Sequence, residues 1–236
     1  MGTIGRFILV VGILLTGCAK EHDYSADDAT FNRIRAAKEL EQRETERKLV
    51  GWSRDLNDKG AETAKAKAAK IFGIEDTAAR RVFMFDSSGS LMTGFDGLRR
   101  RLKDEIAALD SQTAFSVLFF TYEGYAAVDR QWLMADANGK QRAMDFINAL
   151  RPYGSTDPVP GIKQAFALKP DVIYLGTDGD FPNNAAVLDA IRNLDPNHQV
   201  RINTVLLGDG EPEIQALLQG IASESGGRFA RTSLDP

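Results

Sequence analysis

The feature that most constrains this chain is an apolar run ending in an acidic, hydroxyl-rich loop, R-V-F-M-F-D-S-S-G-S over residues 81–90. Residues 82–85 are apolar without interruption, which predicts a strand buried on both faces, as in a parallel sheet. The strand stops at Asp86, so Ser88 and Ser90 fall on the loop beyond its carboxyl end. Because ligands bind at this edge of open α/β sheets, the loop is the first candidate site.

Apolar runs and amphipathic segments then alternate to the end of the chain. This pattern predicts an α/β fold, a doubly wound, Rossmann-like, mostly parallel sheet with helices on both faces. The domain is expected over residues 80–232, with a short edge strand within 122–135. Further strands are expected at 114–120, 171–176, 201–207 and 228–231, and helices at 98–109, 140–150, from 158, from 184 and at 212–225.

Two more oxygen-bearing residues occupy comparable positions. Thr156 directly precedes Asp157-Pro158, and an Asp N-cap followed by Pro predicts a helix start there. Asp178 lies in a T-D-G turn directly after the strand expected at 171–176. Gly176, inside that strand, indicates a close approach by another part of the chain.

Together these residues resemble a known site. Asp86, Ser88 and Ser90 form a D-x-S-x-S motif. Thr156 in a G-S-T loop and Asp178 in the T-D-G turn follow in the order seen in the metal-ion-dependent adhesion site of von Willebrand factor type A domains. The resemblance covers about residues 80–232. One departure is Gly176, since a bulky aliphatic residue is common there.

The resemblance also implies roles. Ser88, Ser90 and Thr156 would coordinate a divalent cation directly, while Asp86 and Asp178 would act largely through water and by orienting the hydroxyls. One free coordination position would accept a carboxylate from a protein partner. The expected function is therefore binding, without turnover.

The donor chemistry agrees with this expectation. The five side chains offer only oxygen, without His or Cys, which suits Mg²⁺ best and also Mn²⁺ or Ca²⁺. A metal-independent scaffold on the same fold is the alternative. A hydrolase using Asp86 is a remote one, because such enzymes typically carry a second Asp two residues on, where this chain has Ser88. No phosphate-binding G-x-x-x-x-G-K-[ST] loop is present, and His22 and His198 lie far along the chain from the Ser motifs.

The first residues read as an export signal. Arg6 is followed by an apolar stretch, 7–15, too short to span a bilayer of about 30 Å. Leu15-Thr16-Gly17-Cys18 resembles the bacterial lipobox, which implies removal of residues 1–17 and acylation of Cys18, the one cysteine of the chain. An ordinary signal peptide or a buried apolar segment is the alternative. A lipid-anchored envelope protein is expected, in the outer membrane if the cell has two, because Ala19 is not the Asp that retains lipoproteins in the inner membrane.

Residues 18–79 are interpreted as a lipidated N-terminus and helical stalk. They are rich in Ala, Glu, Lys and Arg, and helices are expected at 29–50 and 61–70. A coiled coil is excluded because its seam would contain Lys38 and Glu41. The alternative is a partner-binding helix using Phe31, Ile34 and Trp52.

Charge excludes one class of partner. The chain holds 29 Lys and Arg against 33 Asp and Glu, a net charge of −4. No basic stripe interrupts this balance, which argues against nucleic acid as a partner.

Overall fold

The computed structural model describes residues 68–121, 124–179 and 181–234. These residues belong to one compact unit, Ala64–Pro236. The predicted signal peptide, Cys18 and the helix expected at 29–50 lie outside the described residues. No helix among the described residues is long and apolar enough to cross a membrane.

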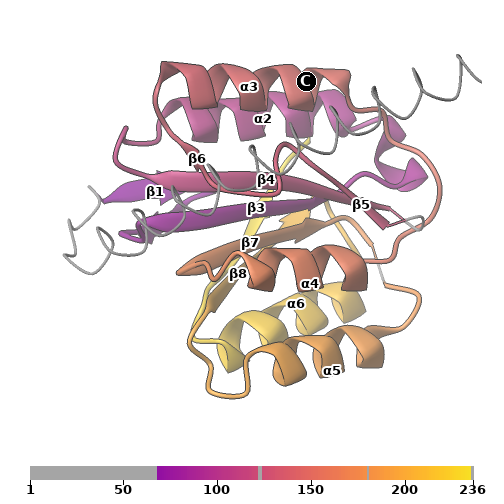
Figure 1. Cartoon of the computed structure of the whole chain (residues 1–236). Helices are drawn as coiled ribbons and strands as arrows, with labels where there is room; N and C mark the ends of the chain where they lie inside the picture. The colour runs from indigo at the N-terminus through magenta and orange to yellow at the C-terminus, as the bar shows by residue number, and fades with distance from the viewer. Residues whose placement is uncertain (1–67, 122–123, 180, 235–236) are drawn as a thin grey trace, which may run out of the picture. The chain divides into compact units, whose positions relative to one another are not determined.

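A mostly parallel sheet forms the centre of this unit (Figure 1). Its strand order is β5-β4-β3-β7-β8-β9, and β6 pairs with β4. The pairs β3–β4, β3–β7, β7–β8 and β8–β9 are parallel, whereas β5 and β6 run antiparallel to β4. The bounds are β3 Arg80–Asp86, β4 Ala114–Thr121, β5 Gly124–Ala127, β6 Leu133–Met134, β7 Val172–Thr177, β8 Arg201–Leu207 and β9 Phe229–Thr232.

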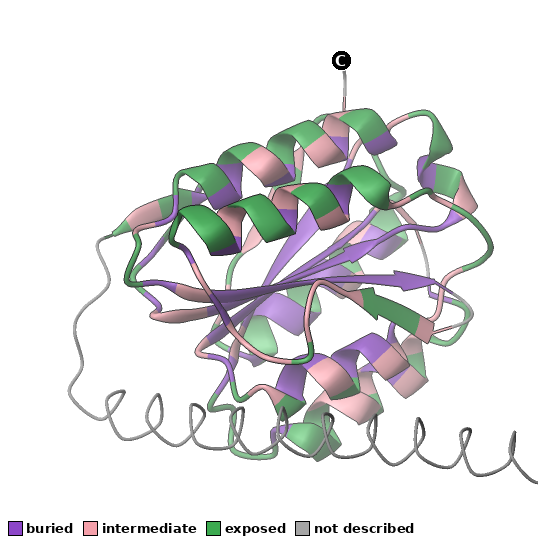
Figure 2. Ribbon diagram, turned by 45° about the horizontal axis from the view of Figure 1, so that its top comes forward, coloured by how far each residue is buried: buried purple, intermediate pink, exposed green. Residues whose placement is uncertain are grey.

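Helices cover both faces of the sheet, which confirms the predicted doubly wound α/β fold (Figure 1). Alternate residues of a strand point to opposite faces, so Phe83 and Phe85 pack with α2 and α3, and Val82 and Met84 pack with α4 and α5. The strands are buried and the outer helix faces are exposed (Figure 2). The helices are α2 Phe95–Ala107, α3 Ala137–Ala149, α4 Val159–Ala167, α5 Asn184–Leu194 and α6 Pro212–Glu224, with a short 3-10 helix, η1, at Gly89–Met92.

Two helix starts illustrate the local sequence signals. Asp157 accepts a hydrogen bond from the backbone N–H of Val159 at 3.0 Å, but α4 begins at Val159 with Pro158 as its N-cap, one residue later than expected. The cap of α5 is Asn183, which accepts from the N–H of Ala186 at 2.9 Å, and not Asn184 as expected. Two adjacent Asn residues are equally good caps, so the sequence could not distinguish them.

A β-hairpin precedes the sheet, in a segment expected to belong to the stalk. Strands β1 (Ala69–Ile71) and β2 (Ile74–Asp76) pair antiparallel around Phe72 and Gly73. Both turn residues have positive φ, 48° and 82°, the geometry of a two-residue hairpin turn. Ile71, Phe72 and Ile74 are buried in the α2–α3 side of the core. The helix expected at 61–70 is therefore wrong at Ala69 and Lys70, and the packed domain begins before residue 80.

A buried polar network fixes this hairpin to the sheet. The carboxylate of Asp76 accepts hydrogen bonds from Arg81 Nε at 3.2 Å and from the Tyr174 hydroxyl at 3.0 Å. It also accepts from the backbone N–H of Ala78 and from Arg201. Arg81 and Asp76 are both 0% exposed at the side chain. A buried charge pair of this kind is tolerated because each partner neutralises the other.

Candidate functional site

The candidate site lies where the connections of the sheet diverge. Strand β3 is between β4 and β7. The chain leaves β3 toward β4 and leaves β7 toward β8, and the carboxyl ends of two strands that diverge in this way are the usual ligand position in such sheets. Asp86 is the last residue of β3, and Asp178 directly follows β7. The topology thus brings two carboxylates, 92 residues apart in the sequence, to one point.

The loop after β3 folds back on its own carboxylate. Asp86 is 1% exposed, and its Oδ1 accepts a hydrogen bond from the backbone N–H of Ser88 at 2.7 Å. This local bond is typical of an Asp that forms a turn with its own backbone. It turns the chain into η1, so that the Ser88 and Ser90 hydroxyls lie 2.9 Å apart.

The second carboxylate, Asp178, is hydrogen-bonded to the same series of side chains. Ser90 Oγ donates to Asp178 Oδ1 at 3.0 Å. The structure therefore brings together four of the five predicted site residues, in the order Asp86, Ser88, Ser90, Asp178. Ser88 is buried and Ser90 is exposed, so the set runs from the interior to the surface.

The loop that carries Thr156 is attached beside this set through its backbone. The N–H of Gly89 donates to the carbonyl of Gly154 at 3.0 Å, and the N–H of Tyr153 donates to the carbonyl of Ser87 at 2.9 Å. Gly154 has φ +71°, a conformation that favours glycine. Within the described residues, no hydrogen bond joins the Thr156 side chain to the other four. The structure thus attaches the Thr156 loop beside the site through Tyr153 and Gly154, and the Thr156 hydroxyl is not part of the hydrogen-bonded series.

Sequence reasoning missed one residue of the site, Thr177. Its hydroxyl is fully buried and donates to Asp86 Oδ2 at 2.8 Å, which fixes the second oxygen of that carboxylate. It also accepts from the N–H of Gly179 at 3.3 Å. Thr177 therefore couples the loops after β3 and β7. The available signal was its place in the T-D-G turn, where only the Asp was assigned a role.

The electrostatics of the set favour a positive charge. Burial raises the pKa of Asp86 to about 6, against the lowering effect of hydrogen bonds from Ser88 and Thr177. Burial also raises the pKa of Asp178. Among the ion pairs of the described residues, none reaches either carboxylate. Two partly desolvated carboxylates without a cationic side chain fit a divalent cation, since buried charge requires a partner.

The donor set also limits which ion fits. It contains two carboxylates and three hydroxyls, and the described residues contain no group of three or more His, Cys, Asp or Glu side chains that could hold a metal. Neutral hydroxyl and carboxylate oxygens suit hard cations such as Mg²⁺. The residues present therefore fit a hard cation better than Zn²⁺ or Cu²⁺.

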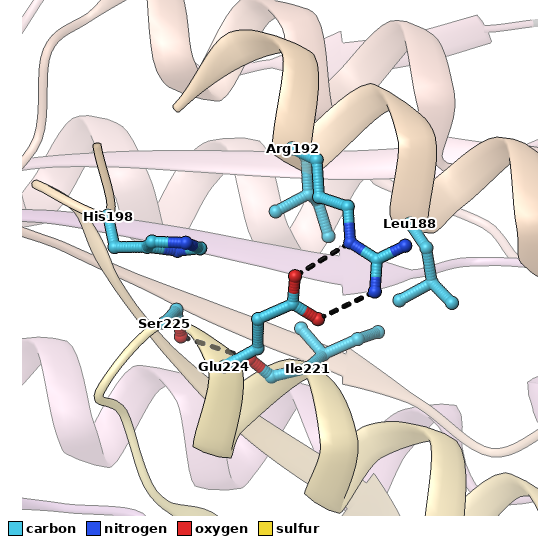
Figure 3. A pocket seen from close by; sticks show the side chains of 7 residues that line it. Leu188, Arg192, His198, Ile221, Glu224 and Ser225 are labelled. Carbon is cyan, nitrogen blue, oxygen red and sulfur yellow. Dashed lines mark hydrogen bonds and ion pairs between the residues drawn. The ribbon is translucent and has the colours of Figure 1, made fainter. Parts of the chain in front are cut away.

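His198 lies in a different part of the domain. It lines a small cavity between the C-terminal ends of α5 and α6, beside Arg192 and Glu224 (Figure 3). Arg192 Nε donates to Glu224 Oε1 at 2.6 Å, which closes one side of the cavity. The cavity, about 10 Å³, has room for about one water. It is therefore too small for a substrate.

Comparison with known proteins agrees with this arrangement. The family model described as von Willebrand factor type A domain matches residues 79–230. The solved von Willebrand factor type A structure from Catenulispora acidiphila is similar at 24% identity and a TM-score of 0.57, over 67% of this chain and 39% of that one. The VWA domain of SpRpn10 is similar at 11% identity and a TM-score of 0.52, over 67% and 90%. These identities support the fold alone. Among curated proteins, none matches the chain.

Proposed function

The chain belongs to the von Willebrand factor type A domain family, and from this premise we propose that it is a binding protein that recognises an acidic residue of a protein partner through a divalent cation. Domains of this family are generally non-catalytic interaction domains. The solved structure from Catenulispora acidiphila extends well beyond the part that this chain matches. The proposed recognition of a partner therefore concerns the domain and its site.

The observation that carries the proposal is the hydrogen-bonded series Asp86, Ser88, Ser90 and Asp178 at the carboxyl ends of β3 and β7, with the Thr156 loop beside it. We call the side chains of these five residues the oxygen set. Ser88, Ser90 and Thr156 would hold the cation directly, and Asp86 and Asp178 would balance its charge and orient the hydroxyls. When bound, the cation would supply a positive charge for a partner's carboxylate. This chain's own contribution is preorganisation, because Thr177 and the Ser88 N–H already fix both oxygens of Asp86.

A metal-independent scaffold is the second candidate, and one observation favours it. The Ser88–Ser90 and Ser90–Asp178 hydrogen bonds satisfy these polar groups without a cation. In that case the fold would bind its partner through other surfaces, and the hydroxyl set would serve only to stabilise the loops.

Attachment to the bacterial cell envelope is part of the proposal. It is supported by the sequence Leu15-Thr16-Gly17-Cys18 and by the apolar stretch before it. Acyl chains on Cys18 would anchor the domain to a membrane, since several acyl chains bind a bilayer stably where one is marginal. Metabolic labelling with radioactive palmitate is expected to label the wild type and not Cys18→Ser. Equal labelling of both would contradict the anchor.

The experiment that tests partner recognition is affinity capture with the full-length chain as bait. Envelope extract would be passed over the wild type with Mg²⁺, the wild type with chelator, and Ser88→Ala with Mg²⁺. Ser87→Ala is the matched control, because Ser87 is a buried neighbour whose hydroxyl donates to the carbonyl of Phe120 outside the oxygen set. The proposal predicts one partner that the wild type and Ser87→Ala capture in Mg²⁺ and that the other two conditions lose.

The scaffold candidate predicts a different outcome. A partner that all four conditions retain equally would contradict recognition through a cation and support the metal-independent scaffold.

A further inference from the structure

A pocket of about 360 Å³ lies next to the candidate site, between the N-terminal ends of α4 and α5. We call it the α4–α5 pocket. Its volume is at the lower end of the range for ligand pockets, about 300–1,000 Å³. Its walls include Thr156, Pro158 and Val159 from the start of α4 and Phe181, Pro182 and Ala186 from the start of α5.

The lining of this pocket is largely apolar, and two of its three polar side chains, Asp157 and Asn183, already accept hydrogen bonds from backbone N–H groups. Phe181 is 4% exposed and Val187 is 1% exposed, so both lie at its buried side. Asp157 accepts from the N–H of Val159, and Asn183 accepts from the N–H of Ala186. Since the other lining side chains, Thr156 apart, are apolar, the pocket suits an apolar occupant better than a polar one.

Thr156 connects the pocket to the oxygen set. It is one of the five candidate ligands and also part of the pocket wall. Its loop is bonded to the loop after β3 through Gly89 and Gly154, and Phe181 follows Asp178 by three residues. A chain segment with a carboxylate at the oxygen set would therefore have its neighbouring side chains beside the pocket.

Exposed apolar side chains on the same loops indicate a protein-binding surface. Met92, at the end of η1, is 68% exposed, and Tyr153, on the Thr156 loop, is 51% exposed. Tyr125 is 40% exposed and pairs with Phe120, which in turn pairs with Asp86, in one row across the sheet. These side chains lie on segments near the carboxyl edge of the sheet, and a protein interface combines apolar anchors with a few polar contacts.

We propose that the α4–α5 pocket receives a large apolar side chain, such as Leu or Phe, from the same partner segment whose carboxylate binds at the oxygen set. This inference rests on the proposed function and adds the partner's chemistry, an acidic residue with an apolar residue at a fixed spacing. The carboxylate of Asp157 at the pocket disfavours a second acidic residue there, because like charges repel across a short distance. The pocket thus determines which partner binds, and the cation held by the oxygen set would attract the partner's carboxylate.

The test is selection of random peptides displayed on phage against the full-length chain in Mg²⁺. The enriched peptides are expected to share an acidic residue and a large apolar residue at one spacing. Ala186→Trp fills the pocket, and Ala185→Trp is its matched control, since Ala185 is exposed and outside the lining. A synthetic copy of an enriched peptide is expected to bind Ala186→Trp at least about tenfold more weakly and Ala185→Trp unchanged, a factor that corresponds to about 1.4 kcal/mol.

A second variant keeps the test valid if Ala186→Trp is unstable. Pro182 is exposed, so Pro182→Glu places a charge at the pocket with little effect on the core. This variant is also expected to bind the peptide about tenfold more weakly. Enrichment of an acidic residue without an apolar neighbour, or unchanged binding to both pocket variants, would overturn the inference and leave the proposed function standing. Enrichment without any acidic residue, or enrichment that persists in chelator, would overturn the proposed function and the inference with it.

Discussion

At the scale of single residues, the site depends on one buried carboxylate and on the groups that hold it. Burial favours the neutral, protonated form of Asp86, whereas a cation site requires the charged carboxylate. Thr177 and the Ser88 N–H oppose the effect of burial by hydrogen bonding to the charged form, although the pKa of Asp86 stays raised, at about 6. Thr177 is the last residue of β7 and Ser88 lies two residues beyond the end of β3, so the site is built on the ends of two central strands.

Thr177→Val is expected to weaken Mg²⁺ binding about 10- to 100-fold, the usual effect of removing a group that orients a ligand. Valine keeps the volume but removes the donor to Asp86 Oδ2. The measurement is calorimetric titration of Mg²⁺ into the full-length chain. Thr121→Val, at the same edge of the sheet, is the matched control and is expected to bind as the wild type. Equal affinity of both variants would contradict the assigned role of Thr177.

A second residue-scale prediction concerns Gly176, where the family commonly has a bulky aliphatic. A Cβ at Gly176 would lie 2.3 Å from two ring atoms of Phe85, so glycine here makes room for that ring. Gly176→Val is expected to lower the free energy of unfolding by about 1–3 kcal/mol through overpacking. Urea unfolding of Gly176→Val, Phe85→Ala and the double variant would measure this change. The double variant is expected to lose less free energy of unfolding than the two single variants added together. Strict additivity would show that Phe85 is not the cause.

At the scale of elements, the β1–β2 hairpin completes the core. Ile71, Phe72 and Ile74 supply apolar surface that would otherwise be missing beside α2. The side chain of Glu105 on α2 accepts from the N–H of Phe72 at 2.9 Å, which fixes the turn. The hairpin is therefore part of the domain rather than of the linker before it.

Truncation tests this boundary. A chain beginning at residue 64 is expected to unfold cooperatively in urea, whereas a chain beginning at residue 80 is expected to unfold at a clearly lower midpoint or to be aggregated, because it leaves the buried Arg81 without Asp76. Circular dichroism in urea would compare them. Equal midpoints would contradict the structural role of the hairpin.

The Asp76 network predicts a pH dependence of stability. Burial raises the pKa of Asp76, but hydrogen bonds from Ala78 and Arg201 together with the charges of Arg81 and Arg201 outweigh it, and the pKa lies below the ordinary value of 3.8. The stabilisation is therefore present above pH 3.8 and is lost as the pH falls through the lower pKa of the folded state.

Asp76→Asn leaves Arg81 buried without a counter-charge, so it is expected to lower the free energy of unfolding at neutral pH by about 3–5 kcal/mol. Its stability is also expected to change less with acid than that of the wild type. Urea unfolding at neutral pH and near pH 3 measures both effects. A parallel acid dependence of the two proteins would show that Asp76 does not carry this pH dependence.

At the scale of the whole molecule, much of the fold could be predicted because its signals are local. The uninterrupted apolar strands and the amphipathic helices between them determine a doubly wound sheet. The order of the three site motifs predicts that Asp86 and Asp178 lie at one edge of the sheet. The hairpin could not be predicted, since Ala69 and Lys70 continue a helix-favouring stretch and its burial depends on contacts with α2. Thr177 and the α4–α5 pocket depend on side-chain positions that the sequence does not specify.

The central claim is that the oxygen set binds a divalent cation, and calorimetric titration of Mg²⁺ into the full-length chain tests it most directly. The wild type and Ser87→Ala are expected to bind one Mg²⁺ with affinities within about twofold of each other, and Ser88→Ala is expected to bind at least about tenfold more weakly. If the wild type bound neither Mg²⁺, Mn²⁺ nor Ca²⁺, or if Ser88→Ala bound Mg²⁺ as tightly as Ser87→Ala, recognition through a cation at this site would be contradicted.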